Sequence, residues 1–340
     1  MPRPSELPSL NIREYEPGDE HAILETFNRV FSQIDPTFQP RTLEAWRWQF
    51  LDNPSGKRIY LALTEEGQVV SQYAGIGQRV LLRGEEALFS QSVDSMTDPA
   101  WRLVLQEPGF FVLTATPYGE QFGGGGDGQD TFMWGLPVWS AWRVGKTFLD
   151  YEVLRTQLKL ATPLDRLRLE QAGGVEVEEV ADFPDDVEPV GRARAEAAGA
   201  FAVRDRAQLS WRFTERPDCD YSIGIARRAG VAVGYAVYRK GLFDRTEDEG
   251  LVCDWVVPPG ETGAHQALLA WLRDKAAATG AERLVTVFPD TAPEWHAFQR
   301  QGFHAAGTMY FIVGRSWVKR VRMRWLFENW VYTLGDTDLV

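Results

Sequence analysis

Residues 283–303 read RLVTVFPDTAPEWHAFQRQGF, and this stretch decides the fold. The apolar run at residues 283–288 ends at Pro289, and its length and flanking residues are those of a buried strand. Residues 292–301 then carry a helical pattern that stops at Gly302. A buried strand followed at once by a helix indicates a βα unit in a layered α/β domain.

The segment before this unit predicts a second helix, at residues 264–279. Its apolar side chains recur at the three-to-four-residue spacing of one helix face, at Ala267, Leu268, Trp271, Leu272 and Ala276. Gly280 follows as a plausible C-cap, because glycine readily adopts the left-handed conformation that ends many helices. The two helices and the strand between them form the centre of one domain.

Outward from this centre, the chain repeats five landmarks in the same order. They are the alternating segments that begin at Asn11 and Val175, the Trp-Arg pairs at Trp46 and Trp211, the hairpin turns at Gly67 and Gly230, the carboxylates Asp94 and Asp254, and the strands at Phe132 and Leu284. Their offsets lie between 152 and 165 positions, which a few loop insertions and deletions explain. The sequence therefore predicts two copies of one unit.

Each copy is expected to run strand, one or two helices, three strands, helix, strand, helix, strand. The copies are placed at residues 1–160 and 161–316, and the linker between them begins at Ala161 and ends at Gly174. Residues 317–340 form an aromatic tail, which we expect either to pack across the domains or to form a homodimer.

Composition excludes several classes of protein. The 340-residue chain has 44% hydrophobic residues and a net charge of -12, so it is globular and repels phosphate backbones, and we expect no nucleic-acid partner. Its two cysteines and four scattered histidines lack metal-site spacing, so no metal is predicted. No apolar stretch approaches the length of a membrane helix or of a signal peptide, so no membrane partner and a cytoplasmic location are expected.

Three features of the chain resemble one superfamily. Residues 297–303 end a helix with an aromatic residue, three residues and Gly-Phe; the Trp46 helix is followed by Asn53-Pro54; and the tail carries an aspartate-rich segment at residues 332–338. In this order they resemble the GNAT (Gcn5-related N-acetyltransferase) superfamily, tandem two-domain type. The resemblance implies an α/β (α+β) fold class of two tandem domains, each a mixed, mostly antiparallel sheet flanked by helices.

The resemblance also implies acetyl-CoA as cofactor. In this fold a loop after the fourth strand opens a helix, and its N–H groups hold the pyrophosphate. The matching positions are Gly260, Thr262, Gly263, Ala264 and His265 in the second copy, and Arg102 and Gly109 in the first.

Both copies depart from the loop pattern of Arg or Gln, two residues, Gly, one residue, and Gly or Ala. Bulky residues and Pro108 follow Arg102, and side chains there hinder a close approach of backbone to phosphate. In the second copy Gly260 replaces the Arg, His265 replaces the last small residue, and Glu261 adds negative charge. These departures leave cofactor binding as an expectation for either copy.

Three residues are candidates for catalysis. Asp94 and Asp254 each sit near the end of the fourth strand, where a carboxylate can act as general base; alternatively, each is a structural residue that accepts backbone N–H bonds. The position of the tyrosine that commonly protonates the leaving thiolate falls on Phe298, and Tyr118 is the candidate substitute.

The function expected from these features is transfer of an acetyl group from acetyl-CoA to a small-molecule amine, such as an amino sugar. The alternative is a catalytically inactive derivative that binds a ligand or a protein partner. A third reading, a tRNA-dependent aminoacyl transferase of the peptidoglycan-bridge type, is disfavoured by the acidic charge.

Overall fold

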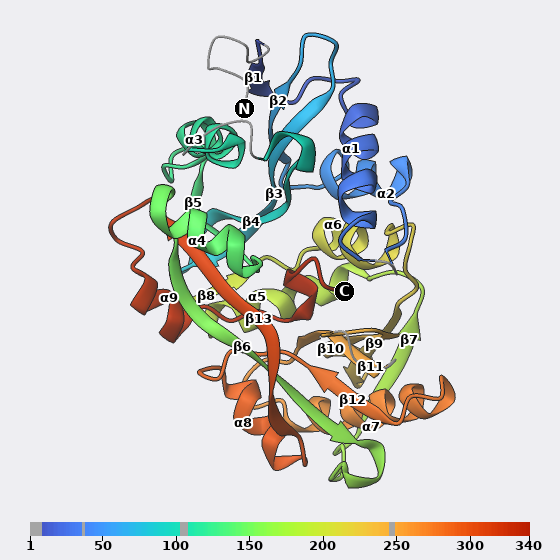
Figure 1. Ribbon diagram of the computed structural model, residues 1–340. Helices are drawn as coiled ribbons and strands as arrows, with labels where there is room; N and C mark the ends of the chain where they lie inside the picture. The colour runs from blue at the N-terminus through green and yellow to red at the C-terminus, as the bar shows by residue number, and fades with distance from the viewer. Residues whose placement is uncertain (1–8, 36–37, 103–107, 245–248) are drawn as a thin grey trace. The chain divides into compact units, whose positions relative to one another are not determined.

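Figure 1 shows the computed structural model of the chain, which describes residues 9–35, 38–102, 108–244 and 249–340. The chain divides into two compact units. Unit 1 comprises residues 1–78, 88–153 and 313–323, and unit 2 comprises residues 79–87, 154–312 and 324–340.

Unit 1 is a mixed sheet with helices. Its strand order is β1-β2-β3-β4-β5-β13. The strands are β1 (Asn11–Glu14), β2 (Lys57–Leu63), β3 (Val69–Leu82), β4 (Glu85–Thr97), β5 (Asp130–Gly135) and the end of β13 (His304–Ser316); the helices are α1 (Glu20–Ser32), α2 (Leu43–Phe50), α3 (Phe110–Phe122) and α4 (Trp139–Phe148). The strand β4 is parallel to β5, whereas β2 pairs antiparallel with both β1 and β3.

Unit 2 repeats this plan, with the strand order β13-β6-β12-β11-β10-β9-β7. Its strands are β6 (Glu152–Pro163), β7 (Val175–Val180), β8 (Ala200–Ala202), β9 (Ser222–Arg228), β10 (Val231–Gly241), β11 (Glu249–Val256) and β12 (Arg283–Thr286); its helices are α5 (Glu188–Glu196), α6 (Arg206–Leu209), α7 (Thr262–Ala278), α8 (Pro293–Arg300) and α9 (Met323–Asn329). Again one pair is parallel, β11 with β12, and its neighbours are antiparallel.

The last strand of each copy pairs with the other copy's sheet. Strand β6 follows α4 in the chain, but it pairs with β12 of unit 2. The end of β13 follows unit 2 in the chain, but it pairs with β5 of unit 1. This exchange explains why the compact units are discontinuous in sequence. The boundaries of the copies at residues 160 and 316 stay a prediction, because they were defined by sequence order and the units by contacts.

Local sequence explains the helices that cover unit 1. Along α1 the buried residues Ile23, Leu24, Phe27 and Val30 form one apolar stripe, which packs in the main core cluster. Helix α2 begins where the Thr42 side chain accepts a hydrogen bond from the Ala45 N–H.

The predicted fold class is confirmed: both units are mixed sheets with flanking helices. The two copies have the same order of elements except for the short strand β8, which the second copy adds between α5 and α6. The strand and helix expected at residues 283–288 and 292–301 are β12 and α8, each slightly shorter than predicted. Among the described residues, no helix is long and apolar enough to cross a membrane. The same residues contain no group of three His, Cys, Asp or Glu side chains that could hold a metal ion.

Candidate functional site

In unit 1 the parallel strands β4 and β5 stop pairing at Ser92 and Gly135, while β4 continues to Thr97. Just beyond this point Asp94 has a φ of 51°, a left-handed conformation that is uncommon for a residue other than glycine. The carboxyl ends of parallel strands are where α/β proteins most often bind ligands. Residues 92–97 therefore form the rim of a candidate site in unit 1.

Several side chains of this rim are partly open to solvent. Ser92, Ser95 and Thr97 are half-buried, and the hydroxyls of Ser92 and Ser95 lie 3.3 Å apart. Leu136, which follows β5, is also half-buried. The rim of unit 1 thus presents hydroxyl groups beside an apolar wall.

The Asp94 carboxylate is already occupied by partners. Both of its oxygens accept hydrogen bonds from the Arg41 guanidinium, and Gln49 donates to it at 3.1 Å. The Gln72 amide donates to the Asp94 carbonyl at 3.0 Å. These bonds fix the left-handed residue at the end of the pairing, so the structure gives Asp94 a positioning role, whereas a role as base remains a prediction.

Tyr118 lies in a buried group of three tyrosines beneath the rim. Its ring is 4.7 Å from that of Tyr73, and the Tyr73 hydroxyl is hydrogen-bonded to that of Tyr151. Burial is the main cause that raises the pKa of all three phenols, to well above the usual value for Tyr118 and Tyr151. The structure thus joins the predicted Tyr118 to Tyr73 and Tyr151, which the sequence analysis missed because they lie on β3 and just before β6.

The Tyr118 hydroxyl faces a buried ion pair. Arg58 Nε lies 2.7 Å from Asp130 Oδ1, and both side chains are almost fully buried. A side chain at Gly75 would collide with the Tyr118 hydroxyl, so a glycine there leaves room for it. Burial raises the pKa of Asp130, against the opposing effect of Arg58.

The predicted cofactor residues of unit 1 flank the start of α3. Arg102 donates through Nε to the Thr97 carbonyl at 3.1 Å. Gly109 is the N-cap of α3, and a Cβ added there would meet nothing within 4 Å. The first N–H groups of a helix lack partners within the helix. Residues 103–107 of this loop lie outside the described residues.

In unit 2 the strand that corresponds to β4 is β11, which has no solvent-exposed rim. The register of β10 against β11 skips Cys253, which marks a bulge directly before Asp254. All eight residues of β11 are buried, in contrast to the half-open rim of β4.

Asp254 is fully buried and fully hydrogen-bonded. Arg204 Nε donates to it at 2.9 Å, the Tyr235 hydroxyl at 3.0 Å, the Thr333 hydroxyl at 2.9 Å and the Trp255 N–H at 3.0 Å. Arg204 also pairs with Asp336 of the tail at 2.8 Å. Four donors on one carboxylate, among them the backbone N–H of Trp255, match the structural alternative that the sequence left open.

The predicted cofactor loop of unit 2 is engaged by its own chain. The N–H of Thr262 donates to the Gly260 carbonyl at 2.9 Å, and Glu261 forms an ion pair with Arg228 at 2.6 Å. A Cβ at Gly263 would lie 2.6 Å from the Ala172 carbonyl oxygen. Gly263 is therefore required by a close contact with residue 172 and needs no phosphate to explain it.

Three aromatic side chains fill the space between α7, α8 and β11. The Trp255 ring lies 5.1 Å from the His265 ring and 4.9 Å from the Phe298 ring, and His265 and Phe298 are 5.5 Å apart. We call this group the aromatic plug. Burial, assisted by the positive charge of Arg300, lowers the pKa of His265 to about 4, so the ring is neutral at pH 7.

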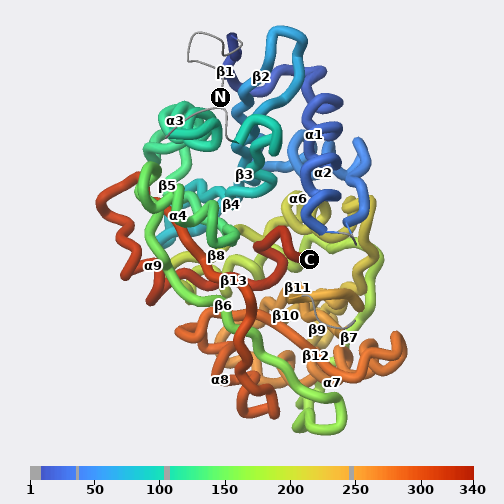
Figure 2. Tube along the Cα trace, in the orientation of Figure 1, coloured from blue at the N-terminus to red at the C-terminus, as the bar shows by residue number. Residues whose placement is uncertain are grey.

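Residues 164–172 follow the end of β6 and contact helix α7 and the residue that ends α8. We call this segment the strap. The strap N–H groups donate to other parts of unit 2 at three places: Leu164 to the Glu282 carbonyl at 3.0 Å, Arg168 to the Gln301 carbonyl at 2.9 Å, and Glu170 to Gln266 Oε1 at 2.8 Å. A Cβ at Gly302 would lie 2.6 Å from the Arg166 carbonyl oxygen. In Figure 2 this segment is the lime-green trace between β6 and β7, beside α7.

The two predicted cofactor loops differ in their surroundings. In unit 2 the strap contacts Gly263 and the aromatic plug includes His265, whereas Gly260 and Thr262 are exposed. A cofactor role for Gly260, Thr262, Gly263, Ala264 and His265 stays a prediction. In unit 1 the rim is half-open and space remains at Gly109, so the described residues there fit a cofactor of the acetyl-CoA type.

Residues 190–303 match the family model described as the acetyltransferase (GNAT) family. A search of the curated proteins finds no relative of this chain.

Solved structures have a similar fold at low sequence identity. A GCN5-related N-acetyltransferase from Anabaena variabilis has a TM-score of 0.69 and 11% identity over 91% of this chain and 73% of that chain. Eis1 from Mycobacterium abscessus has a TM-score of 0.60 and 15% identity over 91% and 74%. A tandem GNAT protein from the clavulanic acid biosynthesis pathway has a TM-score of 0.55 and 12% identity over 91% and 99%. Residues 190–303 therefore match the GNAT family model, and the chain has the fold of solved GNAT proteins, a tandem GNAT protein among them.

Proposed function

We propose that the chain is an N-acyltransferase whose acyl-CoA site lies in unit 1, and that unit 2 is a non-catalytic copy. One observation carries the proposal. The end of β4 keeps two half-buried serines, Ser92 and Ser95, whereas the whole of β11 is buried. The family match supports acyl transfer as the class of reaction, although it falls on the copy that we infer to be closed.

The residues that would hold an acyl-CoA belong to two parts of unit 1. The first N–H groups of α3 and the positive end of its dipole favour the pyrophosphate, and Gly109 leaves space before them. Arg102, on the loop before α3, adds a positive charge. When bound, the cofactor supplies an activated acyl group.

The chain's own residues then hold and move protons. The three phenols are protonated at neutral pH, as tyrosines ordinarily are, and burial raises their pKa further. Tyr73 lies at the rim end of this group, close enough to Ser92 for a hydrogen bond that opposes part of the shift. Tyr73 can therefore donate a hydrogen bond toward the rim, and Tyr151 supports it through the hydrogen bond between the two hydroxyls. Asp94, held by Arg41, fixes the shape of the rim.

The acceptor is proposed to be a small amine, with amino sugars as one class to test. The experiment measures CoA release from acetyl-CoA across a panel of amines, and acetyl-CoA binding by calorimetry. Two variants place the same bulky ring at the start of each site. Ser95→Phe adds a phenyl ring at the rim of unit 1. Thr262→Phe adds the same ring at the exposed first residue of α7 in unit 2.

We expect Ser95→Phe to abolish binding and CoA release, and Thr262→Phe to leave both unchanged. The opposite result would place the cofactor in unit 2 and contradict the proposal. An unfolded Ser95→Phe protein would be recognised by circular dichroism, and Tyr151→Phe, which removes one hydroxyl, would then replace it as the test of turnover.

The second candidate function is a non-catalytic, ligand-binding derivative. The contact of the strap with Gly263 favours it, because it places backbone of the chain beside the loop that a cofactor would use in unit 2. The absence of acetyl-CoA binding by the intact wild-type protein would favour this function over acyl transfer. A homodimer formed through the tail also remains a proposal, and sedimentation equilibrium would test it.

A further inference from the structure

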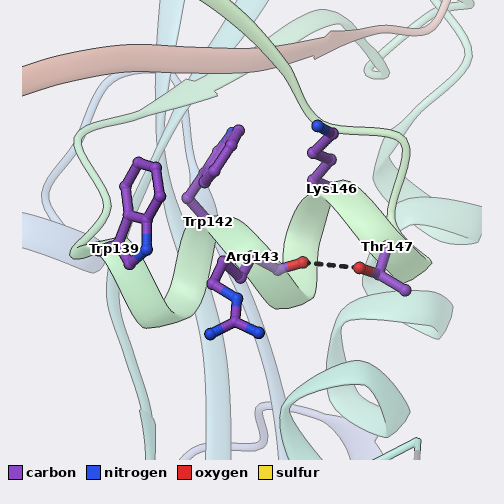
Figure 3. Close-up of a pocket in the computed structure, with 5 residues that line it drawn as sticks. All are labelled: Trp139, Trp142, Arg143, Lys146 and Thr147. Atoms are coloured by element: carbon purple, nitrogen blue, oxygen red, sulfur yellow. Dashed lines mark hydrogen bonds between the residues drawn. The ribbon is translucent and has the colours of Figure 1, made fainter.

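Helix α4 of unit 1 exposes an aromatic and basic surface that the proposed chemistry does not use. A hollow of about 620 Å³ lies along it, lined by Trp139, Trp142, Arg143, Lys146 and Thr147 (Figure 3). Pockets that bind small molecules commonly have volumes of about 300–1,000 Å³. The hollow is thus large enough for a ligand of nucleotide size.

The two indoles form an open wedge. Their ring centroids are 4.6 Å apart with planes tilted by 40°, and Trp139 is 63% exposed. Figure 3 shows both rings and Lys146 on one side of α4, with Arg143 turned to another side. The Lys146 ammonium lies 5.2 Å from the centre of the Trp142 ring, so a positive charge borders the wedge.

The backbone of unit 1 holds α4 in this orientation. Gly145 is the one buried residue of α4, and a side chain there would collide with the ring of Tyr151. The helix therefore approaches unit 1 through its glycine and turns its large side chains outward. Packing of the core does not explain an indole as exposed as Trp139.

The charge of this surface is opposite to that of the chain. The protein has a net charge of -12, yet residues 138–148 contain two cations and no carboxylate. Within the described residues, neither Arg143 nor Lys146 forms an ion pair with a carboxylate. The nearby Asp150 is paired with Arg315 at 3.2 Å. A ligand that brings negative charge would complement these two cations.

We propose that this hollow binds a planar anionic ligand of the nucleotide class, in which a base contacts the indoles and a phosphate pairs with Lys146. Bases stack on aromatic side chains whatever their sequence, and guanidinium and ammonium groups bind phosphate. The ligand is either a free nucleotide or the nucleotide end of coenzyme A. The inference does not depend on acyl transfer.

The test is calorimetry on the full chain with four probes: adenosine, adenosine 3′,5′-bisphosphate, ATP and coenzyme A. Three variants accompany the wild type. Trp139→Ala removes an exposed ring, Lys146→Gln removes the charge beside the wedge, and Lys319→Gln is the matched control at an exposed lysine outside the hollow.

We expect the phosphorylated probes to bind at least tenfold more tightly than adenosine. Trp139→Ala should weaken them by about tenfold or more, since stacking on one aromatic side chain commonly contributes that much. Lys146→Gln should reduce the preference for phosphate, and Lys319→Gln should leave it unchanged. Tighter binding of coenzyme A than of the bisphosphate would identify the cofactor as the source, and equal or weaker binding would identify a free nucleotide.

Two results would overturn the inference: no binding of any phosphorylated probe to the wild type, or binding that Trp139→Ala and Lys146→Gln both leave unchanged. Trp139 is exposed, so its replacement should not unfold unit 1, and circular dichroism would verify this. If the wild type transfers acetyl groups but binds no phosphorylated probe, the hollow is refuted and the proposed function stands. If the wild type binds the probes in the hollow but transfers no acetyl group, the proposed function is refuted and the hollow stands.

Discussion

Replacing Gly263 with alanine tests why a glycine stands at the start of α7. The added Cβ would lie 2.6 Å from the Ala172 carbonyl oxygen and 3.0 Å from a methyl group of Val175. Forcing an extra carbon into such a contact commonly costs about 1–3 kcal/mol. Alanine in a helix recovers up to about 1 kcal/mol relative to glycine. We therefore expect Gly263→Ala to lose about 1–2 kcal/mol of stability in the ligand-free protein.

The assay is urea unfolding of the ligand-free protein, followed by tryptophan fluorescence. The matched control is Gly307→Ala, because Gly307 is in the same unit, has no positive φ, and would place a Cβ in open space. The midpoint for Gly263→Ala should fall clearly below those of the wild type and of the control. If both variants unfold at the same urea concentration, the strap does not press on α7, and the account of unit 2 as closed would be wrong.

The remaining predictions concern buried charge in unit 2. Burial lowers the pKa of His265 to about 4, whereas its ordinary pKa in the unfolded chain is about 6.5, so between these pH values only the unfolded chain binds the proton. The free energy of unfolding should therefore fall by up to about 3 kcal/mol as the pH drops from 6.5 to 4. In urea unfolding, His265→Phe should remove that part of the pH dependence. A slope that is the same in His265→Phe would show that the ring is not buried in its neutral form. Arg204→Met should lower the free energy of unfolding by about 3–5 kcal/mol, because it leaves Asp254 and Asp336 buried without their cation. A thermal melt of Arg204→Met that shifts by less than the melt of the exposed variant Lys319→Gln would refute the proposed network.

Most of the fold could be predicted from the sequence because its signals are local. The apolar run at residues 283–288 and the stripe at residues 264–279 became β12 and α7, and the ordered landmarks became two copies of one series of elements. The exchange of β6 and β13 between units could not be predicted. Strand pairing joins residues that are far apart in the chain. The pattern of apolar residues within a strand is the same whichever of the two sheets it joins, so it does not identify the partner strand.

The site was less predictable because one residue type can serve two purposes. Gly263 matched a phosphate loop, but the same glycine also permits the approach of the strap backbone. Asp254 could have been a base or a structural residue, and its donors come from Arg204, Tyr235 and Thr333, which lie on different elements. Such partners are fixed by the tertiary fold, so no spacing in the sequence revealed them.

The tyrosines of unit 1 show the same limit. Tyr118 was singled out by its place on the chain, whereas Tyr73 and Tyr151 join it only because β3, α3 and the start of β6 meet in unit 1. No local motif marks the three as a group.

The most direct test of the central claim is hydrogen–deuterium exchange with and without acetyl-CoA. Peptides report each copy separately, so the cofactor locates its own site. We predict slower exchange at residues 92–97 and 109–112 of unit 1, with no change at residues 257–266 of unit 2. Protection confined to residues 257–266 would show that the strap and the aromatic plug open to admit the cofactor, and it would contradict the assignment of the acyl-CoA site to unit 1.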